Sequence, residues 1–219
     1  MPEKIVVLSD FDGTIVEIDT GAYLLTEFAN GDWRRLEDQF ESGEITFDEC
    51  LRGQFGMITQ TKDELLKKVD TVRIRPYVID VVRYCRDNGI EFKITSGGLD
   101  FCIQHLLQRN KLEVEVVCPK TTFTCDGLKL DFPELRDPTS FSFKDDAVKR
   151  YHSENYFVLF VGDGYADYYA LKEADLRFVI KDSVSARLLR NGKIDATEVA
   201  DFGPILDKIA NHRTLMRVN

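Results

Sequence analysis

The sequence predicts an α/β protein with a parallel sheet and a helical insertion near its start. Short apolar runs that suit buried parallel strands recur along the chain, and residues 6–8 and 156–161 are the clearest. Stretches with helical spacing separate these runs. Residues 15–72 contain no strand-like run at all, so we interpret them as an inserted helical unit.

The composition limits the possible partners. A chain of 219 residues with 43% hydrophobic content can form one core and a smaller appended unit. Its 38 acidic and 29 basic residues give a net charge of -9, which disfavours nucleic acid and anionic membranes. No apolar run approaches the ~18 residues that span a bilayer. Residues 1–4 lead into the first strand without a signal peptide, so we expect a cytoplasmic protein.

The cysteines indicate neither a metal site nor a disulfide framework. Five of them occur, an odd count without CxxC spacing: Cys50, Cys85, Cys102, Cys118 and Cys125. We expect buried free thiols. Cys118 and Cys125 flank a possible hairpin and could meet across it, but the reduced form is favoured in the cytoplasm.

The inserted unit carries its own helix signals. Apolar spacing predicts helices around Tyr23–Phe28 and Phe47–Phe55, with breaks at 31–32 and 42–43. Thr46 and Thr61 each precede a glutamate by three residues, which is the pattern of a capping box. The insertion ends near Arg75-Pro76.

Helices and strands alternate after the insertion. The expected helices are 77–87, 101–107, 142–151 and 204–210, and the expected strands are 90–95, 114–118, 156–161 and 176–180. Residues 121–132, with a turn at 125–127, predict a hairpin. There is no internal repeat.

Three polar clusters follow three different predicted strands, at residues 10–14, 96–98 and 162–167. Right-handed crossovers put the carboxyl ends of parallel strands at one edge of the sheet, where ligands bind. Each cluster taken alone has a structural explanation. Asp-x-Asp-Gly is ordinary turn chemistry, for example.

The aspartates of these clusters suit phosphoryl transfer. Asp10 and Asp163 offer the hard oxygen ligands that Mg²⁺ prefers, and Asp10 could also attack phosphorus as a nucleophile. Asp12 could protonate the departing alkoxide and then activate water, and its backbone carbonyl could reach the metal.

Four further groups could support this chemistry. The hydroxyl of Ser96 and the backbone of Gly97 could bind an anion, although Ser96 could instead cap a helix. Lys144, at a predicted helix start, could neutralise phosphoryl oxygens and keep Asp10 ionised, or be an ordinary solvated charge. Asp167 lies one helical turn after Asp163 and could support the metal ligands, or merely favour the helix dipole.

The four motifs, in this order, resemble those of the haloacid dehalogenase-like phosphohydrolases, over nearly the whole chain. They are Asp10-Phe11-Asp12-Gly13-Thr14, Ser96-Gly97-Gly98, Lys144 and Gly162-Asp163-Gly164-Tyr165-Ala166-Asp167. The resemblance implies a Rossmann-like three-layer core, 1–14 and 77–219, with strand order 3-2-1-4-5, and a helical cap, 15–76. It also implies Mg²⁺ held by Asp10, the Asp12 carbonyl and Asp163, and phosphate held by Thr14, Ser96, Gly97 and Lys144.

The motif Ile94-Thr95-Ser96-Gly97-Gly98 and the helical insert are similar to the phosphoserine phosphatase branch. Residues 96–101, 55–57 and the hairpin look most like the methionine-salvage enzymes that hydrolyse 2-hydroxy-3-keto-5-methylthiopentenyl-1-phosphate. Gly13 replaces the serine usual in phosphoserine phosphatases, and Asp19 replaces the glutamate that recognises the serine ammonium. Both changes count against L-phosphoserine without excluding it.

The expected function is therefore a Mg²⁺-dependent phosphatase that forms an aspartyl-phosphate from a small metabolite. A methionine-salvage keto-sugar phosphate and phosphoserine are both candidate substrates. Arg52 and Phe55 could contact the substrate together with Asp19, or be an ordinary surface ion pair and a core aromatic. A dehalogenase of the same fold is disfavoured by Asp12, because displacement at a carbon–halogen bond needs no acid for the leaving group there. A phospho-accepting signalling module, or a binding module without turnover, is the alternative of a different class. The sequence does not predict the oligomeric state.

Overall fold

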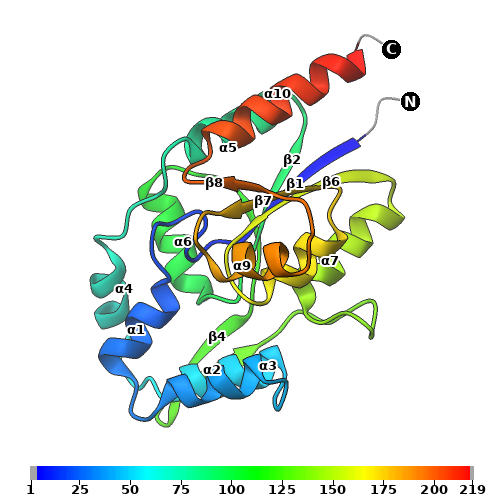
Figure 1. The fold of residues 1–219 in the computed structure, drawn as a ribbon. Coiled ribbons are helices and arrows are strands. Elements are labelled where there is room, and N and C mark those ends of the chain that lie inside the picture. Colours follow the sequence, from blue (N-terminus) through cyan, green and yellow to red (C-terminus); the bar gives the residue numbers. More distant parts are fainter. Residues whose placement is uncertain (1–3, 218–219) are drawn as a thin grey trace.

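A six-stranded parallel sheet forms the centre of the computed structural model, which describes residues 4–217 (Figure 1). Its strands are β1 (Lys4–Ser9), β2 (Glu91–Thr95), β3 (Glu115–Val117), β6 (Tyr156–Gly162), β7 (Leu176–Ile180) and β8 (Thr197–Val199). Their spatial order is β3-β2-β1-β6-β7-β8, and every pair is parallel. The expected order of the first five core strands is confirmed. The edge strand β8 was not predicted.

Alternating side chains of β1 face two helical layers. Val6 and Leu8 pack in a core with α7 (Phe143–Ser153), α8 (Asp167–Glu173) and α9 (Val184–Asn191). Val7 packs on the other face with α5 (Val78–Asp87), α6 (Asp100–Arg109) and α10 (Gly203–Arg217). Because β1 is buried on both faces, its sequence is continuously apolar instead of alternating. The Rossmann-like three-layer core is thereby confirmed.

Between β1 and α5 lie four helices of the insertion: α1 (Thr20–Phe28), α2 (Trp33–Glu41), α3 (Phe47–Phe55) and α4 (Lys62–Val69). The capping boxes predicted at Thr46 and Thr61 are confirmed. Helices α2 and α3 lie at the end of the molecule opposite α10 (Figure 1). The division into a core of 1–14 and 77–219 and a cap of 15–76 stays a prediction, and residues 1–3 and 218–219 lie outside the described residues.

The two connections of the insertion run side by side. Val16 and Ile74 form an isolated antiparallel bridge. The Arg75 N–H donates to the Ile15 carbonyl over 2.8 Å, and the Glu17 N–H donates to the Arg73 carbonyl over 3.1 Å. The insertion therefore leaves and rejoins the sheet at one place.

A hairpin that follows β3 packs against helix α3 of the insertion. The predicted pair, β4 (Lys120–Thr124) and β5 (Gly127–Asp131), is present and antiparallel. Gly127 has φ +130°, and a Cβ there would overlap the backbone of Gly56 at the end of α3. The Arg52 guanidinium on α3 donates to the Leu130 carbonyl and lies 4.8 Å from the centre of the Phe132 ring. The close approach at Gly127 and the contacts of Arg52 thus hold β5 against α3.

The cysteines are free thiols, as expected. Cys50, Cys85 and Cys102 are buried, but Cys118 is only half-buried and Cys125 lies exposed at the hairpin turn, so the expectation of burial is wrong for these two. None of the helices over residues 4–217 is long and apolar enough to cross a membrane. The expectation of no signal peptide concerns residues 1–3, which lie outside the described part of the chain.

Candidate active site

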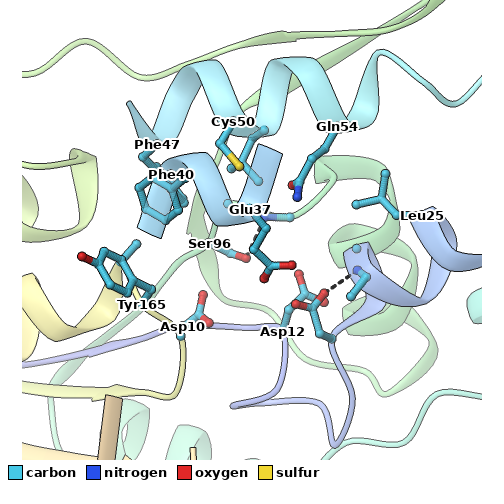
Figure 2. Close-up of a pocket in the computed structure, with 18 of the residues that line it drawn as sticks. Asp10, Asp12, Leu25, Glu37, Phe40, Phe47, Cys50, Gln54, Ser96 and Tyr165 are labelled. Carbon is cyan, nitrogen blue, oxygen red and sulfur yellow. Dashed lines mark hydrogen bonds between the residues drawn. The ribbon is translucent and has the colours of Figure 1, made fainter. Parts of the chain in front are cut away.

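The carboxyl ends of β1, β2 and β6 meet at one edge of the sheet, where they deliver Asp10, Ser96 and Asp163. These three residues, with Asp12 and Lys144, line a cavity of about 240 Å³ under α2 and α3. Figure 2 shows this cavity with the side chains of α2 and α3 above Asp10 and Asp12. The three polar clusters therefore form one site, because parallel strands end at the same edge.

Lys144 bridges two buried carboxylates. Its Nζ donates to Asp10 Oδ1 over 2.8 Å and to Asp167 Oδ1 over 2.7 Å. All three side chains are at least nine-tenths buried. Burial by itself would lower the pKa of Lys144, but the carboxylates of Asp10 and Asp167 outweigh it and raise the pKa. Lys144 is therefore a permanent cation, fixed by the Ser142 cap at the start of α7 and not a solvated surface charge.

Asp167 is committed to the protein's own groups. While Oδ1 accepts from Lys144, Oδ2 accepts the backbone N–H groups of Asp163, over 3.0 Å, and Gly164, over 2.8 Å. Its side chain is fully buried. These contacts fix the loop after β6 and hold Asp163 in place, while the role of Asp167 as a support for the metal ligands stays a prediction.

The first loop of the site leaves space for Asp163 because residue 13 is a glycine. Gly13 has φ +70°, and a Cβ there would overlap the Asp163 carboxylate. The Thr14 hydroxyl donates to Asp163 Oδ1 over 2.7 Å. Thr14 is not among the described residues that line the cavity, so the structure does not group it with the expected phosphate-binding residues. Arg75 braces the same loop, donating to the carbonyls of Gly13 over 2.7 Å and Thr14 over 2.9 Å.

The Asp12 carboxylate is oriented by the start of α1. The N–H of Thr20 donates to Asp12 Oδ1 over 2.9 Å, and the Thr20 hydroxyl donates to the same oxygen. Burial, followed by the nearby Asp19 carboxylate, raises the pKa of Asp12 to about 7. Asp12 can therefore hold or release a proton near neutral pH, as general acid–base work requires.

The loop after β2 supplies donors for an anion. Ser96 is fully buried, and its Oγ accepts the Gly98 N–H over 3.1 Å, so the hydroxyl proton is free to donate. Because Leu99 is the residue that precedes α6, Ser96 is not its cap. A Cβ on Gly97 would lie 2.8 Å from the Phe47 ring and 2.9 Å from Leu51, so α3 closes tightly over this loop.

The donor set fits a hard divalent cation. Asp10, Asp163 and Asp167 each offer a carboxylate oxygen within 4.8 Å of the others. Burial raises the pKa of Asp10 well above its ordinary value, and the charges of Asp167 and Asp163 raise it further against the effect of Lys144. Such excess buried negative charge is what a divalent cation offsets. Since both oxygens of Asp167 already accept hydrogen bonds, Asp10 and Asp163 are the better ligands. The Asp12 carboxylate lies outside this group, leaving only its backbone carbonyl as the expected ligand.

Of the three residues expected to contact the substrate, two line the cavity and one does not. Asp19 and Phe55 line the cavity, with Asp19 also capping α1 by accepting the Ala22 N–H over 2.8 Å. Arg52 is not one of the described lining residues. Its guanidinium donates to the Leu130 carbonyl of β5, and it forms no close ion pair with the described residues, so its contact with the substrate stays a prediction.

Sequence reasoning missed several lining residues on α2 and α3. Among them are Trp33, Glu37, Phe40 and Gln54. The spacing of Trp33, Glu37 and Phe40 by four and three residues marks one helix face and was the available signal. Nothing in that spacing says that the face covers the site.

Comparisons with known proteins place the chain in a family. Residues 7–172 match the family model of the haloacid dehalogenase-like hydrolases. A 2-hydroxy-3-keto-5-methylthiopentenyl-1-phosphate phosphatase of Brevibacillus brevis is 29% identical over 213 residues, which cover 94% of this chain and 95% of that protein. A protein of the same name from Lysinibacillus sphaericus is 30% identical, covering 79% of this chain and 80% of its own.

Solved structures of phosphoserine phosphatases share the fold. A substrate-bound phosphoserine phosphatase complex superposes with a TM-score of 0.69 at 16% identity, covering 95% of this chain and 99% of that chain. The enzyme from T. onnurineus gives 0.67 at 21% identity, covering 95% of this chain and 96% of that chain. At these identities the likeness concerns the fold alone.

Proposed function

This chain belongs to the haloacid dehalogenase-like hydrolases, and from that premise we propose that it is a Mg²⁺-dependent phosphatase of a small phosphorylated metabolite. The observation that carries the proposal is the buried bridge from Asp10 through Lys144 to Asp167, next to Asp163. A cavity of about 240 Å³ suits a small molecule better than a phosphoprotein.

In the proposed first step, Asp10 attacks the phosphorus of the ester. Lys144 holds Asp10 Oδ1, which orients the other oxygen for attack, and its charge favours the ionised carboxylate against the effect of burial. The P–O bond to the leaving group breaks, an aspartyl-phosphate forms, and Asp12 gives its proton to the departing alkoxide.

In the second step, Asp12 takes a proton from water, which attacks phosphorus and releases phosphate from Asp10. The hydroxyl of Ser96, the backbone of Gly97 and the third N–H of Lys144 bind the phosphoryl oxygens in both steps. Thr14 supports the site through Asp163 in this proposal.

We assign the metal to Asp10, the Asp12 carbonyl and Asp163, with Asp167 supporting them. When bound, Mg²⁺ offsets the negative charge of the phosphate and the carboxylates and helps to orient the ester. Cytoplasmic location stays a prediction from the sequence.

The favoured substrate is a keto-sugar phosphate of the kind named for the relatives from Brevibacillus and Lysinibacillus. Phosphoserine is the second candidate, and it rests only on the fold shared with phosphoserine phosphatases. Asp19 retains a carboxylate near the position that would receive its ammonium.

Turnover of p-nitrophenyl phosphate with Mg²⁺ and with EDTA tests the proposal. We expect many turnovers with Mg²⁺ and almost none with EDTA, and no turnover by the Asp10→Asn variant in either condition. A single phosphorylation that persists would support a signalling module instead. Turnover of Asp10→Asn at the wild-type rate would refute the nucleophile assignment.

A further inference from the structure

The cavity beyond the phosphate-binding groups is acidic. Glu37 on α2 and Asp19 at the start of α1 both line it, and Figure 2 shows Glu37 pointing from α2 into the cavity on the side of Asp12. Lys144 is the only basic side chain among the described residues that line the cavity, and Asp10 and Asp167 already hold it. No chain cation is thus available there for a second anionic group of the substrate.

Neither acid forms an ion pair with the described residues, although the charges of Arg34 and Lys144 partly offset those of Glu37 and Asp19, respectively. Glu37 forms no hydrogen bond or close ion pair with the residues described, and Asp19 accepts only backbone N–H groups. Partial burial raises the pKa of Glu37, and the carboxylates of Asp19 and Glu41 raise it further. Two carboxylates that repel each other across a cavity are relieved by a positive or hydrogen-donating group between them.

A buried amide points to the same kind of ligand. Gln54 is 4% exposed, and its Nε2 donates to the Trp33 carbonyl over 3.3 Å. Its Oε1 accepts no hydrogen bond from the part of the chain that the structure describes, and Gln54 lines the cavity from α3 (Figure 2). An amide oxygen that receives no donor from the protein can accept a hydrogen bond from a ligand in the cavity.

Arg52 would be the obvious partner for a substrate carboxylate, but it is not among the described residues that line the cavity. Its guanidinium donates to the Leu130 carbonyl and stacks on Phe132, outside the cavity. A carboxylate placed near Glu37 and Asp19 would face two like charges, which is unfavourable although both side chains are exposed.

We infer that Glu37, together with Asp19 and Gln54, selects phosphate monoesters whose organic part carries hydrogen-bond donors and no second negative charge. Glu37 is the specificity-determining residue of this set. The inference rests on the proposed function and sharpens it, because it favours hydroxyl- or ammonium-bearing esters and disfavours phosphoserine and other carboxylate-bearing esters.

Three two-carbon esters of matched size test the inference: phosphoethanolamine, 2-hydroxyethyl phosphate and phosphoglycolate. The first two carry an ammonium or a hydroxyl on the second carbon, and in phosphoglycolate that carbon is a carboxylate. We expect kcat/KM of the wild type for the first two to exceed that for phosphoglycolate at least tenfold. Glu37→Lys should reduce this preference at least tenfold, mainly through KM. Hydrolysis of phosphoglycolate as fast as that of 2-hydroxyethyl phosphate by the wild type would overturn the inference.

Asp38→Lys provides the matched control. Asp38 is the next residue on α2 and is exposed like Glu37, but it does not line the cavity, so the same charge reversal there should change the preference less than twofold. A Glu37→Lys preference within twofold of the wild type also refutes the inference. If the wild type hydrolysed none of these esters and no p-nitrophenyl phosphate, the proposed phosphatase function itself would be refuted.

Discussion

Replacing Lys144 with methionine tests the electrostatic design of the site. The change shortens the side chain by one atom and removes the only cation within hydrogen-bonding distance of Asp10 and Asp167 among the described residues. Removal of one partner from a buried ion pair typically costs about 3–5 kcal/mol, because the other charge stays buried without compensation. We therefore expect Lys144→Met to lower the free energy of unfolding by about 3 kcal/mol or more at pH 8 in EDTA.

The loss should depend on pH in a defined direction. Burial already raises the pKa of Asp10 above its unfolded value and that of Asp163 to about 7. A raised folded pKa stabilises the protein at low pH, and this contribution is lost as the pH rises through the folded pKa. Without Lys144, the folded protein tolerates these buried carboxylates only when they are protonated. Because protonation is less favourable at high pH, the destabilisation should be larger at pH 8 than at pH 5.5.

Urea unfolding at both pH values measures the effect. Lys149→Met is the control, because Lys149 lies on the same helix with its side chain 28% exposed, where ion pairs contribute only about 0–1 kcal/mol. Equal losses in the two variants, or a larger loss for Lys144→Met at pH 5.5, would contradict the reasoning.

Other expected outcomes concern the acid, the first loop and the hairpin. With alkyl phosphates kcat/KM should fall as the pH rises above about 7, because Asp12 must be protonated to assist the leaving group. p-Nitrophenyl phosphate, whose leaving group needs no proton, should lack this fall in aspartyl-phosphate formation measured by rapid quench, and an equal fall would argue against Asp12 as the acid. Gly13→Ala should lower the free energy of unfolding by about 1–3 kcal/mol and weaken Mg²⁺ binding in a titration, because its Cβ would displace Asp163. Unchanged Mg²⁺ affinity would count against that clash. Arg52→Met should lower stability by about 1–3 kcal/mol and speed proteolysis within 120–131, whereas unchanged cleavage would mean that Arg52 does not hold the hairpin.

The features that sequence analysis predicted are those encoded locally. Residues 10–14 and 162–167 carry their turn signals directly after buried strands, and crossover handedness then places them at one edge. The capping boxes at Thr46 and Thr61 are equally local patterns. Local patterns therefore accounted for the sheet, the helix starts and the clustered aspartates.

The features that it missed depend on tertiary packing. Glu37 is a surface-type residue by its helix pattern, and only the placement of α2 over β1 makes it a cavity residue. The sequence around Arg52 does not show that β5 packs against α3, where the Leu130 carbonyl accepts a hydrogen bond from the Arg52 guanidinium. The strand β8 spans only Thr197–Val199, which is too short to show a period in sequence.

The bridge between Val16 and Ile74 has a consequence for engineering the protein. Since both connections of the insertion start from adjacent points, a short turn could close the gap with little loop entropy. Helices of different length and chemistry could be grafted at that junction while β1 and α5 keep their positions. The helices above the site could therefore be exchanged while the catalytic residues keep their positions, which would alter the preferred ester without altering the reaction.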